Sequence, residues 1–294
     1  MIPTIRTHPA LKLVYNAYVL LFFVYLALPL TVVAVFAFNN SQFPSLPWQG
    51  FTWTWFFGTE QPWLGVFHEG RILGSVGTSA FVAVWVSLLS VGVGTANAFL
   101  FERNEFPFRN ALYVMMLLPL VIPGIILGIS ILVFSNLIAN SAENWFGWDL
   151  EPLRPGLFLV ILGQFSFITT IATLVISARL KKFDNSLEEA ALNLGATPWQ
   201  AVLYVTIPYL RPAMLGAGIV ALLMSFENFN TTLMLVGSDA PLTITMFDRL
   251  KEGSTPVLNA VSLLLMLGSS LLALVMIVFQ RDDGAAAAGG SSGR

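Results

Sequence analysis

One acidic residue lies inside the long apolar runs of this chain. Glu227 occurs in the sequence SFENFNTT, and a charge in a bilayer costs at least about 2.5 kcal/mol even on insertion scales, so a function is expected for it. On a continuous helix, Glu227 shares a face with Asn230 and Thr231, and Phe226 and Phe229 lie beside that face. A carboxylate flanked by aromatic rings can bind an organic ammonium by charge pairing and cation–π attraction. The alternative is a structural hydrogen bond to a neighbouring helix or subunit. The candidate substrate-path residues here are Phe226, Glu227, Asn228, Asn230 and Thr231.

Other kinds of chemistry are excluded by what the chain lacks. It has no cysteine, which rules out disulfides, zinc–thiolate sites and thiol nucleophiles. His8 and His68 are the only histidines and neither lies in an apolar run, so an intramembrane hydrolase would have serines but no base. A phosphate-binding loop requires a lysine directly after a glycine, and no lysine of this chain has that position. We therefore expect no catalytic residue, no metal site and no cofactor on this chain.

A polar segment, SLEEAALNLGATPWQAVLYVTIP over residues 186–208, interrupts the apolar runs. Ser186 and Glu189 have the spacing of a capping box, in which a hydroxyl and a carboxylate each satisfy a backbone N–H at a helix start. Thr197 and Gln200 repeat that spacing. The segment therefore predicts two short helices.

Glycine and proline set the limits of these two helices. Gly195 can take the left-handed conformation that ends the first helix, and Pro198 suits the first position of the second. Pro208 is expected to kink the second helix. A helix resting on the membrane is the alternative, but the nearby lysines precede the helix and alanines bury little area. The first helix instead carries an apolar stripe that suits a partner protein, formed by Leu187, Ala190, Ala191 and Leu194.

The composition is that of an integral membrane protein. Of 294 residues, 56% are hydrophobic and 10% charged, whereas soluble domains average about 25% charged. Six runs exceed the roughly 20 residues that cross a ~30 Å hydrocarbon core, and lipid requires them to be helical. We predict one transmembrane domain over 1–281 with a loop at 179–210, and a flexible tail at 282–294 left from an expression vector. The predicted spans are 15–38, 75–101, 111–138, 157–178, 211–236 and 257–279.

Two of these spans carry further signals. In the third, Pro119 and Pro123 interrupt the hydrogen bonds of a regular helix, which indicates either a packing kink or a broken helix at a transport site. In the second, small residues recur every four positions on two rows and predict close helix packing. The rows are Ser75, Ser79, Ala83, Ser87 and Ser90, Gly94, Ala98.

The basic residues favour a cytoplasmic location for both termini. Ten of the 14 lysines and arginines fall on the side of the N-terminus, which also places 186–208 in the cytoplasm. We expect the outer loop 39–71 to lie along the membrane surface and the outer loop 237–256 to be a solvated rim, with contact to a binding protein as the alternative for each. The first loop suits an interfacial aromatic belt formed by Trp48, Trp53, Trp55 and Trp63. The second holds Asp239, Asp248, Arg249, Lys251 and Glu252.

The polar segment has a recognisable spacing. Glu189-Ala190-Ala191 is followed after three residues by Gly195 and, nine residues later, by Val205-Thr206-Ile207-Pro208. This resembles the EAA loop of ATP-binding-cassette importer permeases, EAA-x3-G-x9-I-x-L-P, with conservative departures at Val205 and Ile207. The resemblance implies ATPase coupling through Ser186, Leu187, Glu188, Glu189, Ala190, Ala191, Leu194, Gly195, Ala196, Thr197, Pro198 and Pro208.

The resemblance covers about 70–281 and is nearest to the spermidine/putrescine permeases. It rests further on Pro119-x-x-x-Pro123, Ser225-Phe226-Glu227, Pro241-Leu242 and Thr255-Pro256-Val257-Leu258-Asn259-Ala260. It implies an all-α integral membrane protein with six transmembrane helices and the type I importer (MetI-like) permease fold. It also implies that Pro119 and Pro123 contribute to the substrate path.

An importer permease of this kind implies several partners. These are two ATPase subunits that carry ATP and Mg, a second permease subunit of a different chain, and a periplasmic substrate-binding protein, in the inner membrane of a bacterium and without nucleic acid. The substrate implied is a polyamine or a similar small organic cation. Alternatives are an importer permease for ferric ion, thiamine or phosphonate, and a secondary transporter driven by an ion gradient.

Overall fold

The computed structural model describes residues 9–43, 46–60, 64–253 and 255–289. The chain divides into two compact units, residues 1–73 with 249–268 and residues 74–248 with 269–294, which are described separately. Within the described ranges, six helices are long and apolar enough to cross a bilayer. They are Pro9–Phe36 (α1), Gly70–Arg103 (α3), Gly124–Phe146 (α5), Leu157–Leu180 (α6), Pro198–Phe226 (α8 to α9) and Pro256–Val275 within α12 (Pro256–Gly289).

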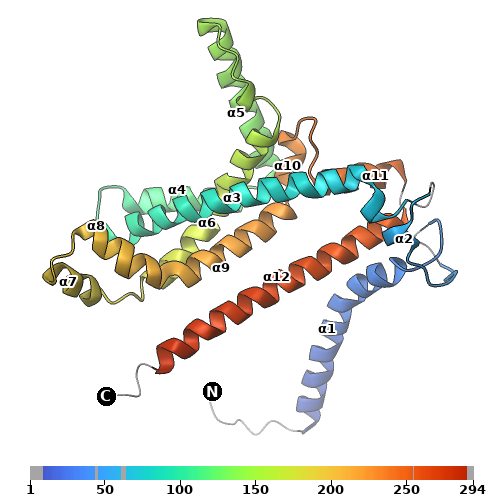
Figure 1. Ribbon diagram of the computed structural model, residues 1–294, viewed down its shortest axis with the longest axis horizontal. Helices are drawn as coiled ribbons and strands as arrows, with labels where there is room; N and C mark the ends of the chain where they lie inside the picture. Colours follow the sequence, from blue (N-terminus) through green and yellow to red (C-terminus); the bar gives the residue numbers. More distant parts are fainter. Residues whose placement is uncertain (1–8, 44–45, 61–63, 254, 290–294) are drawn as a thin grey trace. The chain divides into compact units, whose positions relative to one another are not determined.

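The larger unit is built around α6, which runs beside α3 and α9 (Ile207–Phe226) (Figure 1). Leu159 and Ile168 of α6 are fully buried and pack against Val86 of α3. A second cluster lies further along the same helices and includes Ile176 of α6 and Leu210 of α9. Since apolar side chains gain nothing by leaving lipid, these contacts depend on close packing rather than on the hydrophobic effect.

The small residues of α3 lie at its helix contacts, as their spacing predicts. The Ser87 hydroxyl donates to the Gly218 carbonyl of α9 at 2.8 Å, and the Ser79 hydroxyl accepts from the Leu242 N–H at 2.8 Å. At Gly94, an added Cβ would lie 3.0 Å from the Ala172 Cβ of α6. The absence of larger side chains therefore lets α3 approach its neighbours closely.

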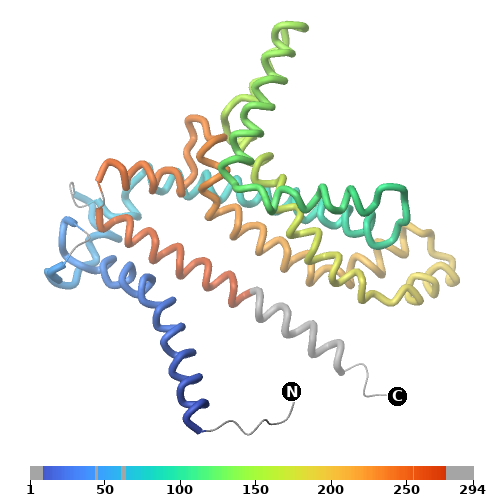
Figure 2. The backbone as a smooth tube through the Cα atoms, turned by 180° about the vertical axis from the view of Figure 1, so that it is seen from behind, coloured from blue at the N-terminus to red at the C-terminus, as the bar shows by residue number. Residues whose placement is uncertain are grey.

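The third predicted span, 111–138, is not one helix. α4 (Arg109–Val121) ends at a break around Ile122–Pro123, and α5 begins at Gly124 and turns away from α4 (Figure 2). Pro119 is accommodated inside α4, whereas Pro123 is the residue before α5. The break occurs here because proline disfavours a helical conformation in the residue before it and cannot donate a backbone hydrogen bond.

The fifth predicted span, 211–236, has different limits. The chain is already helical from Pro198, through α8 (Pro198–Ala201) and a π-helical turn at Val202–Thr206, into α9. Pro208 lies in the first turn of α9, so the π-helical turn accommodates it and the helix runs on. α9 ends at Phe226, and after a short break α10 (Asn230–Leu235) begins.

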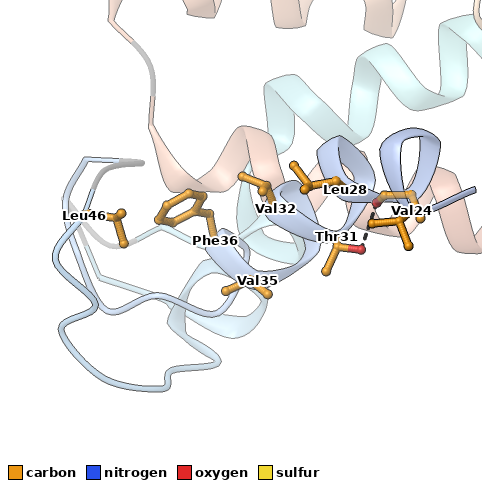
Figure 3. Close-up of a pocket in the computed structure, with 8 residues that line it drawn as sticks. Val24, Leu28, Thr31, Val32, Val35, Phe36 and Leu46 are labelled. Carbon is orange, nitrogen blue, oxygen red and sulfur yellow. Dashed lines mark hydrogen bonds between the residues drawn. The ribbon is translucent and has the colours of Figure 1, made fainter. Parts of the chain in front are cut away.

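In the smaller unit, α1 exposes an apolar surface. A groove runs along this helix (Figure 3). The Thr31 hydroxyl donates a hydrogen bond to the Ala27 carbonyl of the same helix at 2.8 Å, so the surface of the groove is hydrocarbon. A surface of this kind suits lipid chains or the apolar side of another helix. The groove is lined by Val24, Ala27, Leu28, Thr31, Val32, Val35, Phe36 and Leu46.

The loop after α1 forms an aromatic cluster around the short helix α2 (Thr54–Phe57). Phe38 stacks on Phe51 with centroids 5.0 Å apart and meets Trp53 edge to face. Trp53 and Trp48 are exposed, as an interfacial belt requires, but Trp55 is buried and donates to the Asn39 carbonyl at 2.7 Å. Trp63 lies outside the described residues. The belt prediction is therefore wrong for Trp55, which supports the loop from within.

Two segments near the C-terminus are helical beyond the predicted spans. The segment 237–256, which is predicted to be an outer loop, contains a helix, α11 (Leu242–Glu252), with Leu242 and Ile244 buried. Asp239, Lys251 and Glu252 are exposed, as a solvated rim requires, whereas Arg249 on that helix forms an ion pair with Glu69. The backbone of α12 is helical to Gly289, within the segment 282–294 that is predicted as a flexible tail, and 290–294 lie outside the described residues.

Candidate functional site

Two interrupted helices meet in the larger unit. The start of α5 faces the start of α10, where a Cβ added at Gly124 would lie 3.1 Å from the Asn230 Cβ. The Thr231 hydroxyl donates to the Gly124 carbonyl at 3.3 Å. Two sets of residues predicted for the substrate path, from the third and fifth spans, are thus adjacent, with Pro123 just before this contact and Pro119 one turn earlier on α4.

Buried hydrogen bonds hold the break between α9 and α10. Gln164 of α6 is 1% exposed, and its amide nitrogen donates to the Thr232 hydroxyl at 2.8 Å. Its carbonyl oxygen accepts a hydrogen bond from Ser225. The Asn228 side-chain oxygen accepts from the Thr232 hydroxyl at 3.0 Å, and the Asn228 backbone oxygen accepts from Thr243 of α11 at 3.0 Å. Because broken backbone in a membrane must find partners, this network stabilises the interruption.

Glu227 lies at the end of α9, in the break itself. The helix stops before it, so Glu227 does not share one helix face with Asn230 and Thr231, and that prediction is wrong. Glu227 and Asn230 are exposed while Thr231 is buried. Within the described chain, the Glu227 carboxylate makes no hydrogen bond or ion pair. At the break, the Glu227 carboxylate and the Asn230 amide are therefore accessible to a ligand.

The aromatic residues beside Glu227 differ in their surroundings. The Phe229 ring packs edge to face on Phe247 of α11, with centroids 4.8 Å apart. Phe226 is the last residue of α9 and is partly exposed. The combination of an acid with a nearby ring can bind an ammonium group, whereas a metal ion would need several ligands. No cluster of three or more potential metal ligands occurs among the described residues.

The predicted coupling segment forms a short helix, α7 (Ser186–Asn193), but its cap is not the predicted one. Ser186 and Glu189 form no capping box. Instead, Asp184 accepts from the Ser186 N–H at 3.0 Å, and hydrogen bonds from the Ser186 side chain and backbone lower the pKa of the Asp184 carboxyl. The helix begins at Ser186 itself, after Asn185, and the Asp184 carboxylate satisfies its first backbone N–H.

The end of α7 and the start of α8 agree with the sequence. Gly195 has a φ of 92°, and the Ala196 N–H reaches the Ala191 carbonyl at 3.1 Å, which is the Schellman motif. Thr197 and Gln200 form the predicted capping box, with Pro198 at the start of α8. Both helix ends are thus fixed by local hydrogen bonds.

The apolar stripe of α7 is not covered in this chain. Leu187 is 50% exposed and Leu194 is 89% exposed, while Ala190 is exposed and Ala191 partly buried. Trp199 on α8 is 72% exposed. Large apolar side chains that remain uncovered in a single chain suit either a protein partner or a lipid surface.

Glu188 points the other way, into the chain. Arg103 at the end of α3 donates to its Oε2 at 2.5 Å, and the Thr206 hydroxyl donates to its Oε1. Burial opposes ionisation of Glu188, but the bonds from Arg103 and Thr206 and the positive charge outweigh it. The pKa of the Glu188 carboxyl therefore lies below its ordinary value.

Sequence reasoning missed Gln164 and Arg103. A buried amide in the apolar run 157–178 is a signal that was available, since polar groups in membrane helices are expected to be functional or structural. Arg103 contributed only to the charge count. Its pairing with Glu188 joins positions 85 residues apart, and no local pattern encodes such a contact.

Comparison with known proteins identifies the family. Residues 89–281 match the family model described as the binding-protein-dependent transport system inner membrane component. The chain belongs to this family. It is therefore a multi-pass membrane protein, the permease subunit of an importer that works with a binding protein, and the predicted all-α permease fold is confirmed.

Individual relatives are also permease proteins of transport systems. The putrescine transport system permease protein PotI of Escherichia coli (strain K12) is 28% identical over 249 residues, covering 84% of this chain and 83% of PotI. The spermidine/putrescine transport system permease protein PotC of Haemophilus influenzae is 24% identical, covering 87% of this chain and 92% of PotC.

A solved structure shares the fold of this permease. It is a bacterial ABC transporter involved in the import of the acidic polysaccharide alginate, with a TM-score of 0.58 and 14% identity over 95% of this chain and 99% of that chain. At this identity, the likeness concerns the fold alone.

Proposed function

We propose that this permease forms half of the translocation path of an ATP-driven importer for polyamines or similar small organic cations. The observation that carries the substrate class is Glu227, an exposed carboxylate at a helix break in a membrane domain. Acids at such positions are costly and are expected to pair with a cationic group. The names of the relatives PotI and PotC support the same class.

The fold alone does not determine the charge of the solute. The alginate transporter has the same fold and imports an acidic polysaccharide. An anion beside Glu227 would be repelled, whereas a protonated polyamine would gain charge pairing at Glu227 and ring contact at Phe226. The carboxylate is therefore what favours a cation here.

Coupling to ATP uses the segment 186–208. ATP and Mg bind to the separate ATPase subunits, which close on each other and push on the exposed face of α7. α9 begins at the end of this segment and ends at Glu227, a length of about 30 Å for a 20-residue helix. Movement of α9 therefore shifts the break between α9 and α10, and the path opens alternately outward and inward.

The assembly contains two ATPase subunits, a second permease subunit of a different chain and a periplasmic binding protein. The permease lies in the cytoplasmic membrane of a bacterium with both termini in the cytoplasm, as the distribution of basic residues favours. This chain performs no catalysis, because ATP is hydrolysed on the partner subunits.

The substrate class is tested by replacing Glu227 in the assembled importer. Glu227→Gln should lower putrescine uptake by about ten-fold, which corresponds to about 1.4 kcal/mol of lost charge pairing. The ATPase subunits should still co-purify, because Glu227 lies at the opposite end of α9 from the coupling segment. Glu105→Gln removes an exposed carboxylate elsewhere and is the control. Unchanged uptake across a range of putrescine concentrations would contradict the proposal.

A further inference from the structure

Arg103 lies in an environment partly withdrawn from water. The side chains of Arg103 and Glu188 are 24% and 17% exposed. The guanidinium lies over the Phe99 and Phe183 rings, at 5.1 and 5.4 Å from their centroids. Its buried NH2 group has no hydrogen-bond partner among the described residues, so Glu188 is the group that compensates this charge. An ion pair in such surroundings is stronger than an exposed one.

The same carboxylate also reaches α9. Its other oxygen accepts from Thr206, which is fully buried in the π-helical turn before α9. Glu188 therefore joins the middle of α7 to the end of α3 and to the start of α9. A side chain shared between three elements makes them respond together, since each hydrogen bond fixes the position of the next.

The neighbouring carboxylate behaves differently. Glu189 is exposed, and the described part of the chain offers its carboxylate no hydrogen bond or ion pair. Lys181 and Glu102 form a separate pair at 3.4 Å with side chains 62% and 12% exposed, so only its lysine end is open to solvent and salt. Of the two consecutive acids of α7, Glu188 thus points into the chain and Glu189 points to its surface.

We propose that Glu188 is a positioning residue that locks α7 to Arg103 of α3 and Thr206 at the start of α9, while Glu189 stays free for the ATPase. This role rests on the proposed coupling function. It explains how a movement of α7 is transmitted to α3 and α9 together. Without the lock, α7 still binds the ATPase but moves separately from α3 and α9. ATP is then hydrolysed with less solute transported.

The test measures distance and coupling in the complete importer. The chain has no cysteine, so Asn104→Cys and Asn193→Cys, both at exposed positions, take spin labels at the end of α3 and the end of α7. We expect Glu188→Gln to broaden the distance distribution and to lower putrescine uptake per ATP hydrolysed by about five-fold. ATPase co-purification should not change. Glu105→Gln, which removes a carboxylate two residues from Arg103, should alter none of these readouts.

Exchanging the charges of Arg103 and Glu188 distinguishes loss of their ion pair from a general packing defect. Arg103→Glu combined with Glu188→Arg should narrow the distance distribution again and raise the uptake per ATP above that of either single variant. If Glu188→Gln leaves both the distances and the ratio unchanged, or if it prevents ATPase binding as Glu189→Ala is expected to, the lock is wrong.

The same measurements distinguish failure of the Glu188 lock from failure of the coupling proposal. Gly195→Val alters the segment without touching Arg103, Glu188 or Thr206. If Gly195→Val lowers uptake per ATP while Glu188→Gln does not, coupling through the segment stands and the lock fails. If Gly195→Val and Glu189→Ala both assemble and transport as the unmodified chain does, the coupling proposal itself fails.

Discussion

At the scale of single residues, this permease has two glutamates with opposite exposure, and a different role is proposed for each. Glu227 is exposed at a helix break, whereas Glu188 is largely withdrawn from water and holds two hydrogen-bond donors. An exposed acid can accept a passing cation, and an enclosed acid can only fix its neighbours. The difference in surroundings explains why the two glutamates are assigned different roles.

The lowered pKa of Glu188 gives a pH prediction. Because the folded pKa lies below the ordinary value of 4.5, the stabilisation is present above that value and is lost as pH falls through the folded pKa. The difference in melting temperature between the unmodified chain and Glu188→Gln should therefore be constant between about pH 6 and 8 and shrink below 4.5. A difference that vanishes near neutral pH would show that the ion pair does not form.

Gly195 permits a prediction that involves backbone conformation alone. Its φ is 92°, and an added Cβ would meet nothing within 4 Å. Gly195→Ala should thus destabilise the end of α7 by about 1–2 kcal/mol through strain, and Gly195→Asn should cost less because asparagine tolerates this region. Amide exchange within α7 should accelerate by about ten-fold in the alanine variant. Equal exchange in both variants would contradict the left-handed conformation.

At the scale of elements, the membrane helices depend on close approach rather than on apolar burial. Gly94 and Gly92 lie on the same helix, α3, but only Gly94 faces α6, at 3.0 Å from Ala172. Gly94→Ala should lower stability by about 1–3 kcal/mol. Gly92→Ala has open space and should be neutral or slightly stabilising. Thermal unfolding of the two variants in detergent provides the comparison, and similar melting temperatures would contradict the packing of α3 on α6.

The elements also show what local pattern can and cannot predict. The small-residue rows of α3, the Thr197–Gln200 box and the left-handed Gly195 follow from spacing and agree with the structure. The end of α9 at Phe226 does not, because SFENFNTT is as compatible with a helix as with a break. The interruption is stabilised by Gln164, which is 61 residues away from Ser225.

Local pattern has the same limit at the proposed substrate-path residues. Residues from 119–123 and 226–231 were predicted for one function from separate signals, and the structure places Gly124 against Asn230 and Thr231. The adjacency itself was not predictable, since it depends on the turn between α4 and α5. The hydrogen bond from the Ser186 N–H to Asp184 was missed because the spacing of Ser186 and Glu189 also fits a capping box.

At the scale of the whole molecule, the importer should require ATP and no ion gradient. Proteoliposomes that contain the permease, its partner permease, the ATPase subunits and the binding protein measure this directly with labelled putrescine. We predict uptake that depends on ATP on the side of the 186–208 segment and that persists when ionophores collapse ion gradients. Uptake driven by an ion gradient without nucleotide, or no ATP-dependent uptake from a correctly assembled complex, would contradict the account.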